Sequence, residues 1–489
     1  MKFMYIDGEF TKGKSIGEIE VTNPATEEVL DTVPRGTAED VESAVRSSKE
    51  AFKSWRKMGA NERTSLLHEV ASKVRSHQEE IVHLLTLEEG KPVSENEEEL
   101  EWVANTFDYY AELGRHDRGR VIPPGEASQF NFILKEPYGV VGCIVPWNFP
   151  LLLMAWKVAP ALAAGNTVVI KPSEMTPLTT LYMAEHCFDG LPAGVVNVVT
   201  GFGAETGEPL VKHVDVPVIA FTGSLATGQR IASHAAPMMK KLHLELGGKD
   251  ATVIAEDADP EIAAKAVAYA ALINAGQVCT STERVYIPKP KAKQFTEAIV
   301  EHVRSLRLGS GLDASTDVGP MIGDSYRAKV EAHVEDARSH GAKILTGGQR
   351  PKDMSKGWYY EPTVLSGVDH TMLIMTEETF GPAVPLMEYT SFEQAVDLVN
   401  DSKYGLGAVL LSEDPKKIKT FFEDVKAGTI WINDPLTDNY AGPFGGMKYS
   451  GGARELGIEG MDQFRETKHV HWDFNTEAKE YWYPYGRGQ

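Results

Sequence analysis

Residues 140–170 read VVGCIVPWNFPLLLMAWKVAPALAAGNTVVI, and their pattern sets the fold class. The apolar runs at 140–145 and 167–170 have the composition of buried strands, and the segment 151–164 between them is predicted to be a helix. Buried apolar strands separated by helices are typical of a parallel sheet with helices on its faces. This stretch therefore predicts an α/β fold.

The same alternation extends on the C-terminal side. It continues with apolar strands at 195–199 and 218–221, and it restarts with strands at 251–254 and 284–287 that are followed by helices at 260–275 and 291–306. A chain of 489 residues is too long for one hydrophobic core. We therefore expect two doubly wound α/β domains.

Two further segments depart from this alternation. The N-terminal part has the pattern of long amphipathic helices, expected at 38–55, 61–77 and 97–113. Between 120 and 137, Phe130, Phe132 and Leu134 occupy alternate positions, which predicts an extended ribbon. The ribbon is expected to leave the main body as a small β element.

The charge of the chain limits its partners. Its 49 Lys and Arg residues against 70 Asp and Glu residues give a formal net charge of -21. Such a surface repels nucleic acid and anionic membranes, so we expect neither as a partner. Lys157 and Pro160 interrupt the longest apolar stretch, and the first ten residues lack the apolar run of a signal peptide. We therefore expect a cytoplasmic protein.

The three cysteines, Cys143, Cys187 and Cys279, lie far apart and form no CxxC pair. This pattern is typical of a reduced, intracellular chain and does not indicate a disulfide framework or a metal site. Cys143 and Cys187 have apolar surroundings and are expected to fill the core. Cys279 instead follows Asn-Ala-Gly-Gln-Val and precedes Thr280. Glycine permits close backbone approach, and amides and hydroxyls stabilise a thiolate, so Cys279 is predicted to be a reactive cysteine.

Polar residues follow two of the predicted strands, where open α/β sheets bind their ligands. Asn148 lies between two aromatic residues and can donate an N–H to an oxyanion, or it can cap the following helix. Lys171 and Glu174 can hold the hydroxyls of a ribose, or they can form a surface ion pair.

Glycine-rich turns and one carboxylate complete the candidate chemistry. Residues 200–207 contain G-x-G-x-x-x-G, one residue longer than the dinucleotide fingerprint, and Ser224 ends a second turn whose N–H groups can bind a pyrophosphate. Glu245 lies between two leucines in a predicted strand. It is either a general base whose pKa burial raises or an edge-strand residue that faces solvent.

These motifs resemble, in order and over nearly the whole chain, those of the NAD(P)-dependent aldehyde dehydrogenase superfamily. The matching pieces are YIDGEF (5–10), NPATEEV (23–29), PWNFP (146–150), KPSE (171–174), FTGS (221–224), ELGGK (245–249), GQVC (276–279), EETFGP (377–382) and PFGG (443–446).

The resemblance implies catalytic roles. Cys279 is the expected nucleophile toward the aldehyde carbon, and Asn148 with the backbone N–H of Cys279 is the expected oxyanion hole. Glu245 is the expected base for the water that hydrolyses the thioester, so water and not CoA is the expected acyl acceptor. A non-catalytic member of the family, or an esterase that uses the same cysteine, is the alternative.

The resemblance also implies a Rossmann-like cofactor domain. The expected cofactor is NAD, with NADP as the alternative, because the carboxylate of Glu174 suits ribose hydroxyls better than a 2′-phosphate. The expected cofactor contacts are Val145, Pro146, Trp147, Lys171, Ser173, Glu174, Gly203, Gly207, Phe221, Thr222, Gly223, Ser224, Leu246, Gly247, Glu378 and Phe380.

The substrate is harder to predict. Trp156 stands where relatives that bind a carboxylate often carry Arg, and the loop at 433–440 supplies acids and hydroxyls. We expect a small neutral hydroxyaldehyde, an aminoaldehyde or betaine aldehyde, with a semialdehyde as the alternative. The expected substrate pocket is formed by Phe149, Leu153, Trp156, Val278, Thr280, Asp438 and Phe444.

The resemblance finally implies three domains and a homo-oligomer, a tetramer rather than a dimer. We expect the NAD-binding domain at 1–119 and 138–247, the catalytic domain at 248–449, and an oligomerisation element at 120–137 and 450–489. Trp482 and Tyr485 in the aromatic tail either pack over a tunnel mouth or a neighbouring subunit, or form a surface anchor without functional contacts.

Overall fold

Two seven-stranded sheets organise the computed structural model, which describes residues 1–116, 118–483 and 485. In the first sheet, five parallel strands bind one another in the order β11-β10-β7-β8-β9, and two antiparallel strands, β1 and β2, extend one edge. The strands are β1 (Met4–Ile6), β2 (Glu9–Thr11), β7 (Val140–Ile144), β8 (Thr167–Lys171), β9 (Val196–Val198), β10 (Val218–Thr222) and β11 (Lys241–Glu245).

Helices cover this sheet, and α1 packs against β7 and β8 while α5 packs against α4. The helices are α1 (Ala38–Trp55), α2 (Ala60–Ser76), α3 (Gln78–Glu89), α4 (Val93–Leu113), α5 (Pro150–Ala164), α6 (Leu178–His186), α7 (Glu208–Lys212) and α8 (Leu225–Ala235). The prediction of three N-terminal helices was wrong, because α3 is a fourth helix and α4 begins earlier than predicted, directly after Pro92. The acidic run in the first turns of α4 hides its amphipathic pattern but suits the positive end of the helix dipole.

The second sheet has the order β14-β15-β16-β13-β12-β18-β19 and is parallel except for β14. Its strands are β12 (Asp250–Ile254), β13 (Thr282–Pro288), β14 (Lys343–Thr346), β15 (Thr363–Ser366), β16 (Ala383–Tyr389), β18 (Gly407–Leu411) and β19 (Thr429–Ile432). Its helices are α9 (Pro260–Leu272), α10 (Ala292–Ser305), α11 (Asp324–Ser339), α12 (Leu373–Thr376), α13 (Phe392–Asn400) and α14 (Pro415–Asp424). Helix α9 ends three residues earlier than predicted and passes into the short turn Ile273–Gly276.

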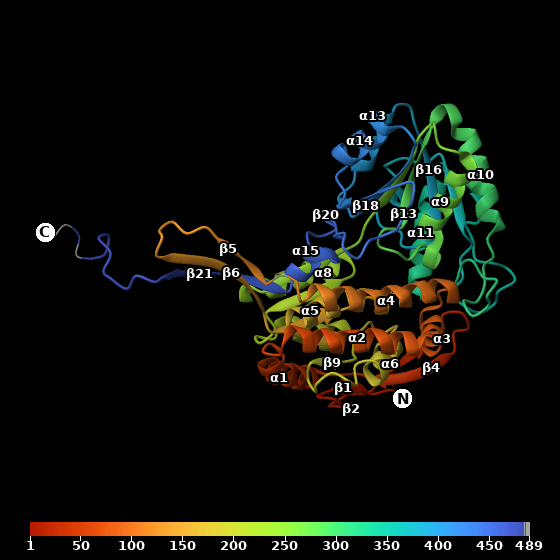
Figure 1. Cartoon of the computed structure of the whole chain (residues 1–489). Helices are drawn as coiled ribbons and strands as arrows, with labels where there is room; N and C mark the ends of the chain where they lie inside the picture. The colour runs from red at the N-terminus through yellow and green to blue at the C-terminus, as the bar shows by residue number, and fades with distance from the viewer. Residues whose placement is uncertain (117, 484, 486–489) are drawn as a thin grey trace.

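The predicted ribbon is part of a three-stranded antiparallel sheet that projects from the body (Figure 1). It contains β5 (Gly119–Ile122), β6 (Gln129–Pro137) and β21 (Arg465–Asp473), and α15 (Gly457–Asp462) leads into β21. Two small antiparallel pairs remain, β3 (Glu18–Thr22) with β4 (Val29–Pro34) and β17 (Tyr404–Gly405) with β20 (Met447–Lys448). The α/β fold of two large sheets and a small β element thus agrees with the expectation, and the domain boundaries stay a prediction.

The C-terminal segment lies beyond this projecting sheet and away from the body of its own chain (Figure 1). Tyr481, Trp482, Tyr483 and Tyr485 are all more than half exposed. The tail therefore does not cover a tunnel mouth of its own chain, and packing on a neighbouring subunit stays a prediction. The rest of the predicted element, at 486–489, lies outside the described residues.

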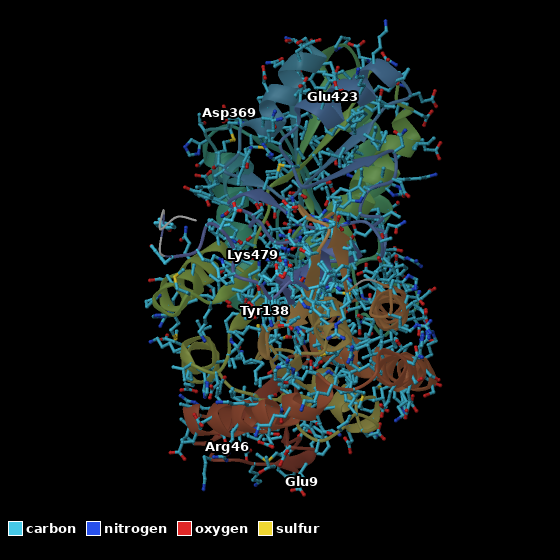
Figure 2. All side chains as sticks on the ribbon, turned by 60° about the vertical axis from the view of Figure 1, so that its left-hand side comes forward. Glu9, Arg46, Tyr138, Asp369, Glu423 and Lys479 are labelled. Atoms are coloured by element: carbon cyan, nitrogen blue, oxygen red, sulfur yellow. The ribbon has the colours of Figure 1, made fainter. Side chains whose placement is uncertain are left out.

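The two sheets lie at opposite ends of an elongated body. Figure 2 places Glu9 and Arg46 at one end and Asp369 and Glu423 at the other. Cys143 and Cys187 are buried in the core of the first half, where burial raises the pKa of each thiol to about 12, so both are core residues as predicted. Among the described residues, no helix combines the length and the apolar character that crossing a membrane requires.

Candidate active site

The loop that carries Cys279 begins with a strained turn. Asn274 and Ala275 have φ angles of 49° and 54°, in the left-handed region that such residues rarely adopt. Gly276 follows with a φ of 73°, and a Cβ there would lie 2.3 Å from the carbonyl oxygen of Gly381. Each strained non-glycine residue costs about 1–3 kcal/mol, and such strain is concentrated at functional sites. The turn thus directs Cys279 out of the helix and into the space between the two sheets.

Cys279 lines two cavities, which we call the groove and the tunnel. The groove has a volume of about 370 Å³ and is lined by the ends of β7, β8, β10 and β11. It contains fifteen of the sixteen predicted cofactor contacts, together with Ile144, Asn148, Thr227, Tyr326 and Lys329. Gly207, the sixteenth, does not line the groove. It ends the π-helical turn Gly203–Gly207, and a Cβ at this position would lie 3.8 Å from the Cδ of Lys171.

The groove fits a dinucleotide. Lys171 is buried, Glu174 is half exposed, and their charged groups lie 3.2 Å apart at the end of β8, so the pair faces the cavity instead of open solvent. Ser224 caps α8 by accepting a hydrogen bond from the N–H of Thr227, and the N-terminus of this helix provides positive potential for a pyrophosphate. At the other end, burial raises the pKa of the Glu378 carboxyl to about 7, beside the ring of Phe380.

Asn148 is held by the cysteine loop and does not cap α5. Its Nδ2 donates to the carbonyl oxygen of Gln277 at 2.9 Å, and its side chain is buried. An amide nitrogen carries two hydrogens, so one N–H stays available for a substrate oxygen. The cap of α5 is supplied by the carboxylate of Glu99, which accepts the N–H groups of Leu151 and Leu152 at 3.1 and 3.0 Å.

Glu245 is the last residue of β11, at the edge of the first sheet, but it is buried and does not face solvent. It lines neither cavity, and within the described part of the chain its carboxylate oxygens have no hydrogen-bond partner. Burial, reinforced by the nearby carboxylate of Glu455, raises its pKa well above the ordinary value, and Lys157 acts in the opposite direction. Lys157 donates hydrogen bonds to Glu455 and to Thr222.

The thiol of Cys279 carries a proton at neutral pH in this arrangement. Burial raises its pKa well above the ordinary value, and the carboxylates of Asp250, Glu245 and Glu378 raise it further. Since the thiolate is the reactive form, the site requires a base to remove this proton.

Cys279 also lines the tunnel, which contains all seven predicted substrate-pocket residues. Most of its other lining residues lie on the faces of α4, α5 and α9, and the sequence did not indicate them because they form no local motif. The other lining residues are Glu95, Glu98, Glu99, Trp102, Leu152, Tyr269, Ile273 and Leu436. The tunnel thus combines aromatic faces with carboxylates.

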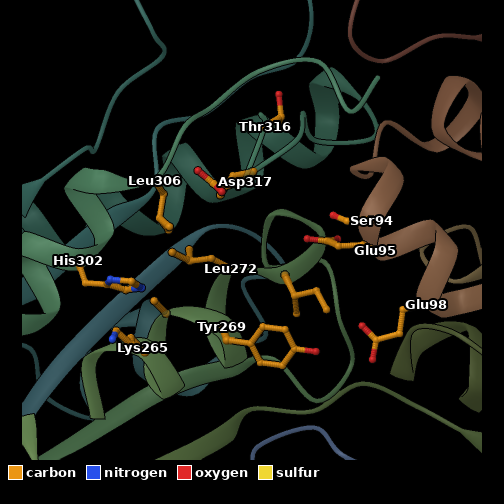
Figure 3. A pocket seen from close by; sticks show the side chains of 13 residues that line it. Ser94, Glu95, Glu98, Lys265, Tyr269, Leu272, His302, Leu306, Thr316 and Asp317 are labelled. Atoms are coloured by element: carbon orange, nitrogen blue, oxygen red, sulfur yellow. The ribbon is translucent and has the colours of Figure 1, made fainter. Parts of the chain in front are cut away.

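A third cavity, of about 350 Å³, lies beside the tunnel (Figure 3). The two share Glu95, Glu98, Tyr269 and Ile273 as lining residues. In Figure 3, the ring of Tyr269 lies between the two glutamates on one side and Lys265 and His302 on the other. Burial raises the pKa of Glu95 to about 8, and its carboxylate accepts the N–H of Asn274 at 2.9 Å.

The candidate cysteine, the candidate amide donor and the groove belong to a chain that matches a known family. The family model described as "Aldehyde dehydrogenase family" matches residues 10–470. The chain belongs to the aldehyde dehydrogenase family. This match confirms the predicted family and the prediction of an aldehyde dehydrogenase.

Individual members of the aldehyde dehydrogenase family match the chain over almost its full length. It is 39% identical to the betaine aldehyde dehydrogenase of Bacillus subtilis over 473 residues, which cover 96% of each chain. It is 38% identical to the peroxisomal aminoaldehyde dehydrogenase 2 of Pisum sativum, with 96% of this chain and 95% of that one covered.

A solved aldehyde dehydrogenase structure has the same fold. The betaine aldehyde dehydrogenase of Staphylococcus aureus in complex with NAD+ superposes with a TM-score of 0.96 at 37% identity, and the match covers 99% of this chain and 96% of that chain. The NAD+ in this relative agrees with the predicted cofactor. The roles of individual residues, the preference for NAD over NADP and the oligomeric state stay predictions.

Proposed function

We propose that this aldehyde dehydrogenase oxidises a cationic aldehyde, an ω-aminoaldehyde or a trimethylammonio aldehyde, to the carboxylic acid with NAD. The observation that carries the proposal is the lining of the tunnel. Aromatic rings and carboxylates surround it, and within the described part of the chain neither Lys nor Arg lines it. The two relatives named above, which are a betaine aldehyde and an aminoaldehyde dehydrogenase, also support this substrate class.

The aromatic residues suit an alkylammonium group. The ring of Trp102 lies 4.1 Å from that of Tyr440, and the ring of Trp156 lies 5.0 Å from that of Phe444. Aromatic faces attract ammonium and trimethylammonium groups by about 0.5–2 kcal/mol each, more where water is excluded. These rings can therefore bind a cation without a directional hydrogen bond.

The carboxylates of the tunnel disfavour an anion. Burial raises the pKa of Asp438 to about 7, so its charge is costly until a cation binds beside it. Glu95 and Glu98 lie where the tunnel adjoins the third cavity. A bound ammonium ion would stabilise the ionised form of these groups, whereas a second carboxylate would be repelled. A semialdehyde with a terminal carboxylate is therefore a poor candidate.

We assign the chemical steps to three residues. The Sγ of Cys279, after its proton has passed to a water molecule, adds to the aldehyde carbon, and the free N–H of Asn148 with the backbone N–H of Cys279 stabilises the resulting oxyanion. NAD, when bound in the groove, accepts the hydride from that carbon, which leaves a thioester. Water then hydrolyses the thioester, releases the acid and returns the thiol.

Glu245 is the proposed base for the attacking water. It lines neither cavity, so its side chain has to turn from its buried position toward the tunnel. The presence of a base supports water as the acyl acceptor. The pKa values of Glu245 and Cys279 are both raised, so both groups lose their protons more readily as pH increases, and activity is expected to rise above neutrality.

A substrate panel tests the proposal. Initial rates of NADH formation give kcat/KM for betaine aldehyde, 4-aminobutanal, butanal, lactaldehyde and succinic semialdehyde, with NAD and with NADP. We expect the two cations to exceed butanal by about tenfold or more, the ratio that a 1.4 kcal/mol difference gives. Succinic semialdehyde or lactaldehyde as the best substrate would contradict the cation proposal but not the aldehyde oxidation.

We also propose that the chain forms a homo-oligomer through the projecting sheet. Val121, Phe130, Trp472 and Phe474 are exposed apolar residues on or next to its strands, and such patches mark association surfaces. Light scattering on the full chain and on a chain truncated after Asp473 tests this and the role of the aromatic tail. An unchanged mass and unchanged kinetics after truncation would show that the tail contributes neither to oligomerisation nor to catalysis.

A further inference from the structure

We infer that Lys91 is a positioning residue for the reaction, which holds the main chain of Asn148 through a buried network with Glu89, Glu99 and Asn274. The inference rests on the proposed role of Asn148 as an oxyanion donor. Lys91 lies in the turn between α3 and α4 and is a lining residue of neither the groove nor the tunnel.

The ammonium group of Lys91 is fully buried and has charged partners on two sides. It forms ion pairs with Glu89, at 3.1 Å, and with Glu99. Burial by itself lowers the pKa of the ammonium group, but the two carboxylates outweigh this effect and raise it. A buried ion group without partners is strongly destabilising, so this lysine stays charged only because the network surrounds it.

The same ammonium group contacts the Asn148 segment directly. It lies 3.5 Å from the carbonyl oxygen of Asn148 and 3.9 Å from the ring centroid of Phe149, over the face of the ring. Through Glu99 it also reaches the next residues, because Glu99 accepts the N–H groups of Leu151 and Leu152. Lys91 and Glu99 therefore fix the main chain that directly follows the Asn148 side chain, from the carbonyl of Asn148 to the first turn of α5.

Asn274 connects this network to the cysteine loop. Its Nδ2 donates to Glu89 at 2.8 Å and to the carbonyl oxygen of Asn148 at 2.8 Å. Asn274 also has the strained φ of 49°. The network thus holds the segment of Asn148 against the turn before Cys279. The distance between these two segments sets the separation of the two donors of the proposed oxyanion hole.

The arrangement explains why a charged group is buried at this place. A hydrophobic residue would fill the volume, but it could not bind two carboxylates that each bind another part of the site. Oxyanion donors act only when they lie at hydrogen-bond distance from the developing charge, and a displacement of about 1 Å can cost on the order of a hundredfold in rate. Lys91 therefore acts through Asn148.

A double-mutant cycle tests this coupling. The variants Lys91→Met, Asn148→Ala and the double variant are compared with the parent chain by kcat/KM for 4-aminobutanal at saturating NAD. We expect Asn148→Ala to lose about a hundredfold and Lys91→Met on the order of tenfold to a hundredfold. The double variant should fall within about twofold of Asn148→Ala alone, because the lysine has nothing left to position.

Alkylation of Cys279 by iodoacetamide supplies a second readout. This reaction needs the thiolate but forms no oxyanion, so Lys91→Met should keep the alkylation rate within about twofold of the parent. If Lys91→Met does not fold, Glu99→Gln replaces it in the cycle, since its amide oxygen still accepts the two N–H groups of α5 but its NH₂ cannot accept from Lys91.

Glu88→Gln is the matched control. Glu88 is a neighbouring buried carboxylate that binds the N–H groups of Leu178 and Thr179 at the start of α6, far from the Asn148 segment in the chain. Any decrease in kcat/KM caused by Glu88→Gln should therefore multiply with the decrease caused by Asn148→Ala. If the losses of kcat/KM caused by Lys91→Met and Asn148→Ala also multiply in the double variant, the inference about Lys91 is wrong, while the role of Asn148 stands. If Asn148→Ala keeps the activity of the parent, both the proposed oxyanion role and the inference about Lys91 are wrong.

Discussion

The groove and the tunnel meet at Cys279, but they are built in different ways. Strand ends of the first sheet form most of the groove, with Lys171, Glu174 and the helix end at Ser224 as its polar groups. Faces of α4, α5 and α9 form half of the tunnel, which combines aromatic rings with carboxylates. Because the cysteine loop is the main element that they share, the choice of cofactor and the choice of aldehyde should change independently.

The largest effect is expected at the shared residue. Cys279→Ala removes the proposed nucleophile, so aldehyde-dependent NADH formation should fall on the order of 10⁴-fold or more. Binding of NAD, measured by calorimetry, should persist, because the groove residues are unchanged. NADH formation at a rate near that of the parent would contradict the assignment of the nucleophile.

A change in the tunnel should affect cationic aldehydes alone. Asp438→Asn should lower kcat/KM for betaine aldehyde by about tenfold, as expected for the loss of one buried charge interaction. The value for butanal and the KM for NAD should stay the same. An equal decrease in kcat/KM for butanal would show that Asp438 affects the shape of the tunnel and not its preference for a cation.

The same carboxylate predicts a pH dependence. Since the pKa of Asp438 is raised to about 7, the group is neutral below and charged above that pH. The ratio of kcat/KM for betaine aldehyde to that for butanal should therefore rise as pH increases from 6 to 8. In Asp438→Asn this ratio should be flat, and a rise that persists in the variant would assign the titration to another group.

A change in the groove should affect the cofactor alone. Glu174→Gln removes the carboxylate next to Lys171, so the KM for NAD should increase several-fold, the effect of about 1 kcal/mol from a hydrogen bond to a charged group. The KM for NADP should fall relative to that for NAD, because a 2′-phosphate no longer meets a negative charge. If Glu174→Gln also changed the order of preference among aldehydes, the groove and the tunnel would not select their ligands independently.

The smallest effect concerns the thiol itself. The carboxylate of Glu245 is one of the groups that raise the pKa of Cys279, so Glu245→Gln should move the midpoint of iodoacetamide labelling to lower pH. Labelling in the absence of cofactor, with Cys279→Ala as the background, measures this. A midpoint that moves upward would show that Glu245 assists ionisation of the thiol in the parent chain.

The difference between the cavities also explains how much the sequence could predict. Groove residues such as Trp147, Glu174 and Ser224 follow strands directly, and short motifs at strand ends are visible in one sequence. Trp102 and Tyr269 lie inside amphipathic helices where apolar residues also serve the core, so only the packing of α4 and α9 brings them to the tunnel. The proposed role of Lys91 depends on its contact with Asn148, which lies 57 residues away in the sequence, so no local motif indicates it.

The projecting sheet has a consequence for how the chain is made. Strand β6 pairs along its whole length with β21, and the side chains of Glu136 and Lys468 that meet across this pair are 332 residues apart in the sequence. At about 5–20 residues per second, a ribosome needs roughly 20–60 s to synthesise the intervening chain. During that time one edge of β6 presents unpaired backbone groups that favour pairing with other chains. Completion of this fold therefore depends on the last part of the protein to be synthesised, and C-terminal truncations before β21 should aggregate during expression.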